Sequence, residues 1–108
     1  MKWVLLIWSV FVWGTLSSQI EVIEFNASFN IANSCPWVDE LTDCDVKHVD
    51  IQLFPDKQKK YKIVVVPTII VLSDGEEVKR YQANIMMTME ATKEEAQETI
   101  DELIMSDF

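Results

Sequence analysis

The sequence is poor in glycine, proline, cysteine and histidine, and each shortage narrows what the chain can be. Its 108 residues include only two Gly and three Pro, so we expect regular elements joined by few loops. Two cysteines are too few to define a disulfide scaffold. A single histidine without clustered cysteines makes a transition-metal site unexpected. We therefore predict neither a metal nor a cofactor.

Basic residues are also scarce, because 9 Lys and Arg stand against 18 Asp and Glu, which gives a formal net charge of −9. Such an acidic surface repels the phosphates of nucleic acids and the headgroups of anionic lipids. We expect no nucleic-acid partner, and contact with a membrane only through the N-terminal segment. The length corresponds to a single domain.

Residues 1–18, MKWVLLIWSVFVWGTLSS, have the layout of a secretory signal peptide, with one lysine, a short apolar core and small or polar residues after it. A membrane-spanning helix needs about 20 apolar residues, and Glu21 and Glu24 keep this stretch shorter. We predict a leader removed near residues 17–19. A retained N-terminal anchor and a first folded element are the alternatives. We expect the chain to be exported, to a periplasm, a secretory lumen or the cell exterior, and residues 19–108 to form its domain.

The segment KIVVVPTIIVLSDGEEVKR predicts a β-hairpin. Its two runs of β-branched residues favour strands over helix, and unbroken apolar runs are typical of strands buried on both faces. Asp74-Gly75 between them is typical of a type I′ turn, in which both central residues need positive φ. We predict strands over residues 67–73 and 76–82, with Pro67 at the start because proline cannot donate to a ladder.

The rest of the domain alternates strands and short helices. A capping-box pattern at Thr92 and Glu95 opens a final helix, which has Ala96, Ile100, Leu103 and Ile104 on one face. The remaining predicted elements are strands at 20–25 and 46–53, a helix at 36–43, a short helix or turn at 55–61, and a loop at 26–34.

The hairpin carries a resemblance to the thioredoxin family. Val66-Pro67-Thr68, an apolar strand, Asp-Gly-Glu and a second strand with Arg80 resemble the C-terminal half of that family, and Phe25-Asn-Ala-Ser-Phe29 resembles its entry to the active-site loop. The resemblance implies a thioredoxin-like α/β fold, a minimal β-α-β-α-β-β-α core with a central mixed sheet. It also implies a cis bond before Pro67 and a groove beside it.

The redox dithiol of that family is missing. Members with oxidoreductase activity carry Cys-x-x-Cys at the first strand-to-helix junction. Counted forward from Phe29, the two cysteine positions hold Asn30 and Asn33. If a helix separates Cys35 from Cys44, nine positions along, their Cα atoms lie roughly 13 Å apart, and a disulfide needs about 7 Å or less.

Cys35 is the candidate nucleophile that remains. Cys35-Pro36-Trp37-Val38 resembles the Cys-Pro-aromatic-Cys of glutaredoxins, with Val38 in place of the second cysteine. A thiol at a helix N-terminus has a depressed pKa and can form mixed disulfides, which would make the chain a monothiol oxidoreductase. The alternative is a small buried residue without chemistry.

Glu24 and His48 form a second candidate pair. By the resemblance to thioredoxins, Glu24 matches the family's buried acid, and His48 lies where the family usually has a lysine. In an oxidoreductase such a carboxylate relays protons to the resolving thiol. Without that thiol, a Glu–His hydrogen bond is the simpler role.

Residues 84–91, NIMMTMEA, form a Met-rich segment. Ile85, Met86, Met87 and Met89 are side chains of the kind that line adaptable binding surfaces. The simpler expectation, which we adopt, is that they pack beneath the final helix as ordinary core.

These patterns favour a non-catalytic protein that binds another protein or a peptide. The alternatives are a monothiol oxidoreductase that uses Cys35 and a small structural subunit of a larger assembly. The residues expected at the binding groove are Val66, Pro67, Thr68, Phe29, Asn30, Asn33 and Trp37.

Overall fold

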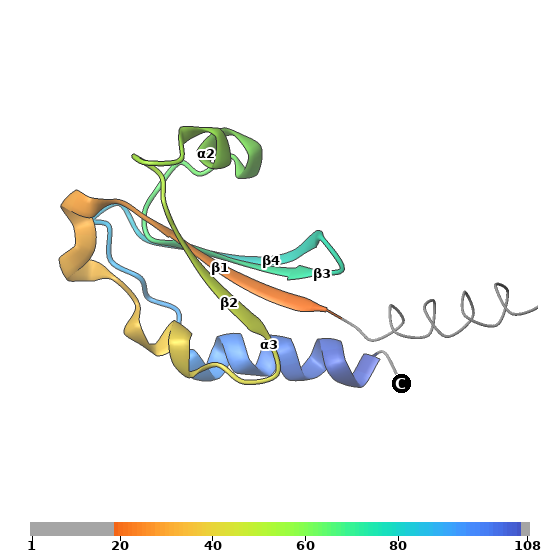
Figure 1. The fold of residues 1–108 in the computed structure, drawn as a ribbon. Helices are drawn as coiled ribbons and strands as arrows, with labels where there is room; N and C mark the ends of the chain where they lie inside the picture. The colour runs from red at the N-terminus through yellow and green to blue at the C-terminus, as the bar shows by residue number, and fades with distance from the viewer. Residues whose placement is uncertain (1–18, 107–108) are drawn as a thin grey trace, which may run out of the picture.

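The computed structural model describes residues 19–106, which form a four-stranded sheet with helices on both faces (Figure 1). The strand order is β2-β1-β3-β4; β1 is parallel to β2 and antiparallel to β3, and β3 is antiparallel to β4. The expected mixed α/β sheet is confirmed. The strands are β1 (Ile20–Asn26), β2 (Asp45–Asp50), β3 (Thr68–Ser73) and β4 (Glu76–Gln82). The helices are the 3-10 helices η1 (Ser28–Asn33) and η2 (Pro36–Glu40), and the α-helices α2 (Pro55–Tyr61) and α3 (Lys93–Ser106).

The leader predicted for residues 1–18 lies outside the described residues. None of the helices within residues 19–106 combines the length and the apolar character that a membrane crossing requires.

The β3–β4 hairpin follows the sequence closely. Asp74 and Gly75 have φ of 52° and 87°, which confirms the expected turn with two positive φ angles. The Val66–Pro67 bond is cis, as the resemblance implied. Strand β3 begins at Thr68, one residue after the proline, because Pro67 has no N–H for the ladder.

The first helix differs from the prediction. The expected α-helix over residues 36–43 is wrong, since η2 is a 3-10 helix that ends at Glu40. The side chain of Gln97 on α3 accepts from the Thr42 N–H (2.9 Å) and donates to the Thr42 carbonyl (3.2 Å). This tertiary contact satisfies the Thr42 backbone groups in place of another helical turn.

Two other segments also differ from their predicted secondary structure. The expected loop at 26–34 contains η1, and β2 ends at Asp50 instead of residue 53. The Asp50 carboxylate accepts from the Gln52 N–H (2.9 Å), and the Asp50 carbonyl accepts from the Leu53 N–H (3.1 Å). An Asp side chain that bonds the backbone two residues on favours a turn over a continued strand.

Apolar residues on the two faces of the sheet form two cores. Alternation along β1 and β3 sends neighbouring side chains to opposite faces. One core lies against α3 and η2 and includes Val22, Val38, Ile69, Val71, Ala96 and Ile100. The other lies against α2 and includes Ile23, Phe25, Val66, Ile70 and Leu72, with the Phe25 ring centroid 5.2 Å from that of Tyr61.

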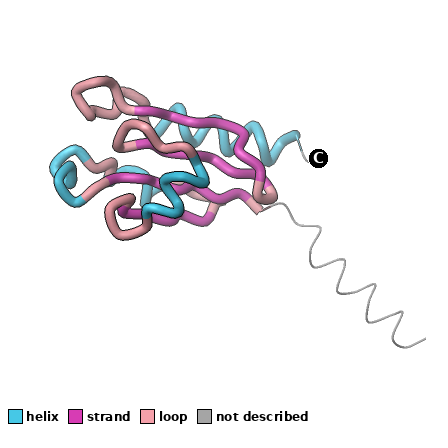
Figure 2. The backbone as a smooth tube through the Cα atoms, turned by 90° about the horizontal axis from the view of Figure 1, so that it is seen from above, coloured by secondary structure: helices cyan, strands magenta, loops and turns pink. Residues whose placement is uncertain are grey.

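The register brings four connections to one end of the sheet. Phe25 near the end of β1 pairs with Thr68 at the start of β3, and Thr68 pairs with Gln82 at the end of β4. The turns after β1 and β2 and the segments 62–67 and 83–92 therefore gather there (Figure 2). We call this the loop end. It is the part of the fold that positions the candidate site.

Candidate functional site

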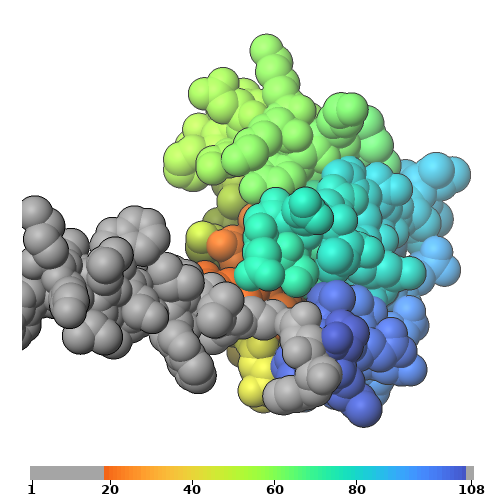
Figure 3. Space-filling model, turned by 90° about the vertical axis from the view of Figure 1, so that its right-hand side faces the viewer, coloured from red at the N-terminus to blue at the C-terminus, as the bar shows by residue number. Residues whose placement is uncertain are grey.

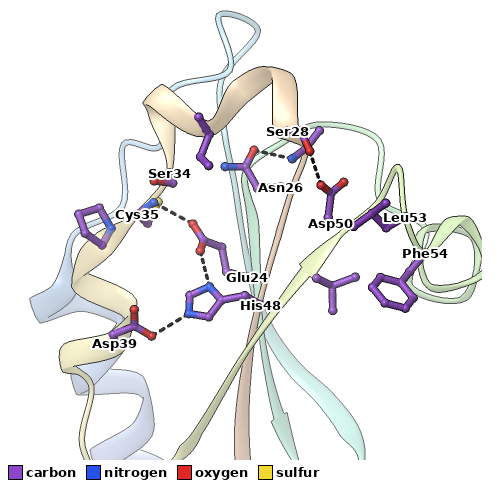
Figure 4. Close-up of a pocket in the computed structure, with 14 residues that line it drawn as sticks. Glu24, Asn26, Ser28, Ser34, Cys35, Asp39, His48, Asp50, Leu53 and Phe54 are labelled. Atoms are coloured by element: carbon purple, nitrogen blue, oxygen red, sulfur yellow. Dashed lines mark hydrogen bonds and ion pairs between the residues drawn. The ribbon is translucent and has the colours of Figure 1, made fainter.

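Glu24 is a buried carboxylate at the centre of a polar network. The parallel register sets it beside His48 on β2, and its residue is only 4% exposed. Its Oε1 lies 2.8 Å from His48 Nδ1, and its Oε2 accepts from the Cys35 N–H at 2.8 Å. On the outer side, His48 Nε2 lies 2.7 Å from Asp39 Oδ1 (Figure 4). The expected Glu24–His48 hydrogen bond is present, and the network joins β1, β2 and η2.

The histidine in this network favours its charged form. Partial burial lowers the pKa of His48, but hydrogen bonds to Asp39 and Glu24 and the charges of these carboxylates outweigh it and raise the pKa above its ordinary value. A protonated imidazole donates from both nitrogens, which suits a position between two carboxylates. His48 thus bridges the sheet to η2.

Cys35 lies in the same network but is not activated by it. Burial, the Glu24 charge and a hydrogen bond to Glu24 raise the pKa of the Cys35 thiol to about 12. A monothiol enzyme requires a depressed thiol pKa, and the shift at Cys35 is in the opposite direction. The residue is also only 4% exposed. Burial and the charges of Asp45 and Asp43 also raise the pKa of Cys44, and both cysteines are free.

Asparagines occupy the positions where the family resemblance places two cysteines. Asn33 Nδ2 donates to Asn30 Oδ1 at 2.9 Å, so a hydrogen bond joins these two positions. The buried Asn30 amide lies 3.2 Å from Asn26 Oδ1, 3.3 Å from the Val66 carbonyl and 3.5 Å from the Met87 carbonyl. Asn30 thereby ties η1 to the segment before Pro67 and to the Met-rich segment.

A groove of about 280 Å³ opens at the loop end, beside this asparagine. We call it the Val66 groove; its lining is Phe29, Ile51, Val64, Val65, Val66, Asn84, Ile85 and Met87. The lining comes from four segments that are distant in sequence.

The residues expected at the groove are only partly brought together. Phe29 and Val66 line it, whereas Pro67 and Thr68 are fully buried. Asn30 is buried, and Asn33 lies at the exposed end of η1. Trp37 does not line this groove but packs against the α3-side core, because η2 lies on that face of the sheet.

The sequence prediction missed Ile51, Val64, Val65 and Asn84 at the groove. Val64 and Val65 stand in an apolar run, which indicated burial. Val64 is nevertheless 80% exposed, because β3 begins only at Thr68 and the residues before it lie outside the ladder. The sequence offered one signal for these residues: the apolar run begins several residues before the strand does.

The Met-rich segment is a surface turn. The expectation that it packs as core is wrong for Ile85 (96% exposed), Met86 (77%) and Met87; only Met89 packs against the α3-side core. Asn84 Oδ1 accepts from the Met86 N–H (2.9 Å) and the Thr88 N–H (3.2 Å). These bonds form a turn that directs Ile85 and Met86 outward.

Exposed apolar side chains concentrate at the loop end. Of the ten large hydrophobic residues that are exposed among those the structure describes, only Val78 and Met105 lie elsewhere. The other eight are Phe29, Ile31, Leu53, Phe54, Val64, Ile85, Met86 and Met87. Contiguous exposed apolar residues mark interaction sites more often than isolated ones do.

A second cavity of about 550 Å³ lies between η1, η2 and β2. Glu24, Asp39 and His48 line it together with Leu53 and Phe54 (Figure 4). No set of three His, Cys, Asp or Glu residues suited to a metal ion occurs within residues 19–106. Two groups of polar side chains in the lining are bonded internally, Glu24–His48–Asp39 and Ser28–Asp50.

Comparisons with known proteins bear on the fold. No protein-family model and no curated protein matches the sequence. Among solved structures, a mutant thioredoxin from Halobacterium salinarum is 20% identical, with 78% of this chain and 74% of that chain covered and a TM-score of 0.64. Fasciola hepatica thioredoxin is 23% identical (82% and 85% covered, TM-score 0.62). Thioredoxin-2, a component of malaria parasite protein secretion machinery, is 16% identical (80% and 84% covered, TM-score 0.64). The chain therefore has a thioredoxin-like fold.

Proposed function

We propose that this chain is an exported thioredoxin-fold protein that works without a redox dithiol and binds a segment of another protein in the Val66 groove. The observation that carries the proposal is the concentration of exposed apolar side chains around that groove. Phe29, Val64 and Ile85 are all more than half exposed and come from three separate segments.

Burial of these side chains supplies the driving force. Each Å² of apolar surface removed from water contributes about 25 cal/mol, and side chains such as Phe and Met are enriched at the centres of interfaces. The groove is also fixed in place, because Asn30 holds both of its walls through the Val66 and Met87 carbonyls. A preorganised groove loses less conformational entropy on binding.

Side-chain burial is the main attraction in this mode of binding. In the thioredoxin family, as the resemblance implies, extended substrates pair with the backbone beside the proline. Here the Asn30 amide already donates to the Val66 carbonyl at 3.3 Å. We therefore propose recognition of apolar side chains in preference to a full backbone ladder.

The burial and the raised pKa of Cys35 argue against the alternative, a monothiol oxidoreductase. A buried thiol with a pKa of about 12 stays protonated at neutral pH, and the thiolate is the nucleophile. We propose that Cys35 is a structural residue of the α3-side core.

Export rests on the leader pattern of residues 1–18. Expression of the full chain in a secreting host, followed by N-terminal sequencing of the exported product, tests it. We expect a product that begins near Gln19. Retention of the whole chain in the membrane would instead favour the anchor.

The binding proposal is tested with a library of short random peptides displayed on phage and selected on the immobilised full chain. We expect enrichment of peptides with apolar residues, and affinities for the selected peptides that fall about tenfold in Val64→Ser or Ile85→Ser. Val78→Ser is the matched control, since Val78 is an exposed valine on β4 outside the groove. Equal losses in Val78→Ser, or no enrichment, would overturn the proposal.

A permanent subunit of a larger assembly is the second candidate, and the exposed Ile85 and Met86 favour it. Dissociation kinetics separate the two candidates. A partner that stays bound at a fixed stoichiometry in native mass spectrometry supports a subunit, whereas rapid exchange of selected peptides supports a binding module.

A further inference from the structure

Positive charge is concentrated in one segment of this acidic chain. Residues 51–67 contain four lysines and one aspartate, a net charge of +3, although the whole chain carries −9. The four lysines lie on α2 or directly after it, and all are exposed. We call Lys57, Lys59, Lys60 and Lys62 the lysine patch.

Within residues 19–106, no carboxylate forms an ion pair with the lysine patch. Among the other basic residues of this range, Lys47, Arg80 and Lys93 form ion pairs with Glu21, Glu77 and Glu40 respectively, and Lys79 forms none. A lysine without a carboxylate partner keeps its full attraction for an incoming acid.

The carboxylates that line the 550 Å³ cavity, by contrast, accept hydrogen bonds from other groups of the protein. Glu24 and Asp39 both bond His48, and Asp50 accepts from the Ser28 hydroxyl and the Gln52 N–H. These bonds hold the cavity carboxylates in fixed positions but leave negative charge there, so the positive charge of this region is confined to the lysine patch.

Contacts with β4 and with the α2-side core hold the segment that carries the lysine patch in place. Arg80 on β4 donates to the carbonyls of Tyr61 (2.6 Å) and Lys62 (3.2 Å), and the Tyr61 ring packs on Phe25. The α2 region projects from the body of the molecule on the side away from α3 (Figure 3). These contacts hold the lysines in a defined position relative to the sheet.

The lysine patch and the Val66 groove share one segment of the chain. Ile51 and Val64 from this basic segment line the groove, and the exposed Leu53 and Phe54 lie between Ile51 and α2 in the sequence. We expect a bound chain that leaves the groove along this segment to meet apolar side chains first and then lysines.

We infer that the segment bound in the Val66 groove is acidic, with Asp or Glu residues beside its apolar residues that contact the lysine patch. The inference rests on the proposed function and specifies its partner class. Charge complementarity selects this occupant over a second copy of the chain, because two copies with a net charge of −9 each repel one another.

The test uses the full chain, held through a C-terminal tag, and short random peptides on phage as the probe. Helix α3 ends on the opposite side of the molecule from the loop end, so the tag leaves the groove open (Figure 1). Selected peptides are then synthesised, and their affinities are measured from about 0.05 M to about 0.5 M salt.

Two triple variants provide a matched comparison. Lys57→Gln/Lys59→Gln/Lys60→Gln and Lys47→Gln/Lys79→Gln/Lys93→Gln change the net charge by the same amount at different positions. The second variant also breaks the surface pairs Lys47–Glu21 and Lys93–Glu40. We expect selected peptides to be rich in Asp and Glu, and their affinity to fall about tenfold in the first variant and less than about twofold in the second.

Each outcome bears on a different claim. Neutral or basic peptides that depend on Val64 but bind both triple variants equally would overturn the acidic partner and leave the proposed function standing. Acidic peptides that lose equal affinity in both variants would also overturn it, because net charge alone then explains binding. Failure to enrich any peptide would overturn the proposed function together with the inference.

Discussion

The Glu24 network and the Val66 groove, which both adjoin η1, differ in which side chains are buried and bonded and which are exposed. In the network, Glu24, Cys35 and His48 carry reactive groups, but each is bonded to a neighbour and two of them are buried. In the groove, Phe29, Val64 and Ile85 carry no chemistry and are left exposed to water. We therefore propose that the reactive-looking residues stabilise the fold and that the exposed apolar ones are the candidates for recognition.

The comparison is sharpest at Cys35. In a Cys44→Ser variant of the full chain, alkylation of Cys35 in the folded protein at neutral pH should be on the order of a thousandfold slower than in urea, since its pKa is raised to about 12. Iodoacetamide labelling followed by mass spectrometry measures both rates. Fast labelling of the folded protein would revive the monothiol enzyme.

Removal of the buried carboxylate tests the Glu24 network. Glu24→Ala leaves the Cys35 N–H and His48 without their acceptor, and we expect a loss of about 2–4 kcal/mol in the free energy of unfolding. Glu21→Ala on the opposite face of β1 removes only a surface pair with Lys47, so it should lose less than about 1 kcal/mol. Urea unfolding of both variants decides; equal losses would count against a structural role specific to Glu24.

Asn30 ties η1 to both walls of the Val66 groove. Asn30→Ala removes the donor to the Val66 and Met87 carbonyls and should lower the free energy of unfolding by about 1–3 kcal/mol. Hydrogen exchange should show faster opening around Met87. The exposed Asn33→Ala is the control, with less than about 1 kcal/mol expected.

His48 makes the network sensitive to pH. Its pKa is raised in the folded protein, so its contribution is present below the ordinary value of about 6.5 and is lost as the pH rises through the folded pKa. As the pH rises above about 6.5, wild-type stability should fall more steeply than that of His48→Gln. Because His48 is about half exposed, solvent screening should keep the difference below about 1 kcal/mol. Parallel curves would remove His48 as the cause.

The smallest stability effect is expected on the recognition side. Val64→Ser should change the free energy of unfolding by less than about 0.5 kcal/mol, because the side chain is exposed. Val66→Ser, two residues along, should lose about 1–3 kcal/mol, because Val66 is buried in the α2-side core. Chemical unfolding of the pair would show whether Val64 is free of a structural role.

Local patterns were enough for the elements that depend on neighbours in sequence. Asp74-Gly75 predicted its turn, because positive φ is a property of the residues themselves. Thr92 opens α3 as expected, with the Glu95 N–H donating to its hydroxyl at 3.2 Å. The pairing of Glu24 with His48 was also reached, but through the family resemblance.

Residues distant in sequence decided the rest. Gln97 on α3 bonds the Thr42 backbone just after η2 ends at Glu40. Burial and the Glu24 charge raise the pKa of the Cys35 thiol, although a helix N-terminus alone suggests the reverse. The Met-rich segment is exposed because the Asn84 side chain forms a turn there. Composition does not reveal whether an apolar residue faces a core or water, because that depends on which strands and loops meet around it. By itself the sequence determined the strands, the turn and the fold class; only the tertiary structure placed the apolar side chains at the loop end and bonded the reactive ones to their neighbours.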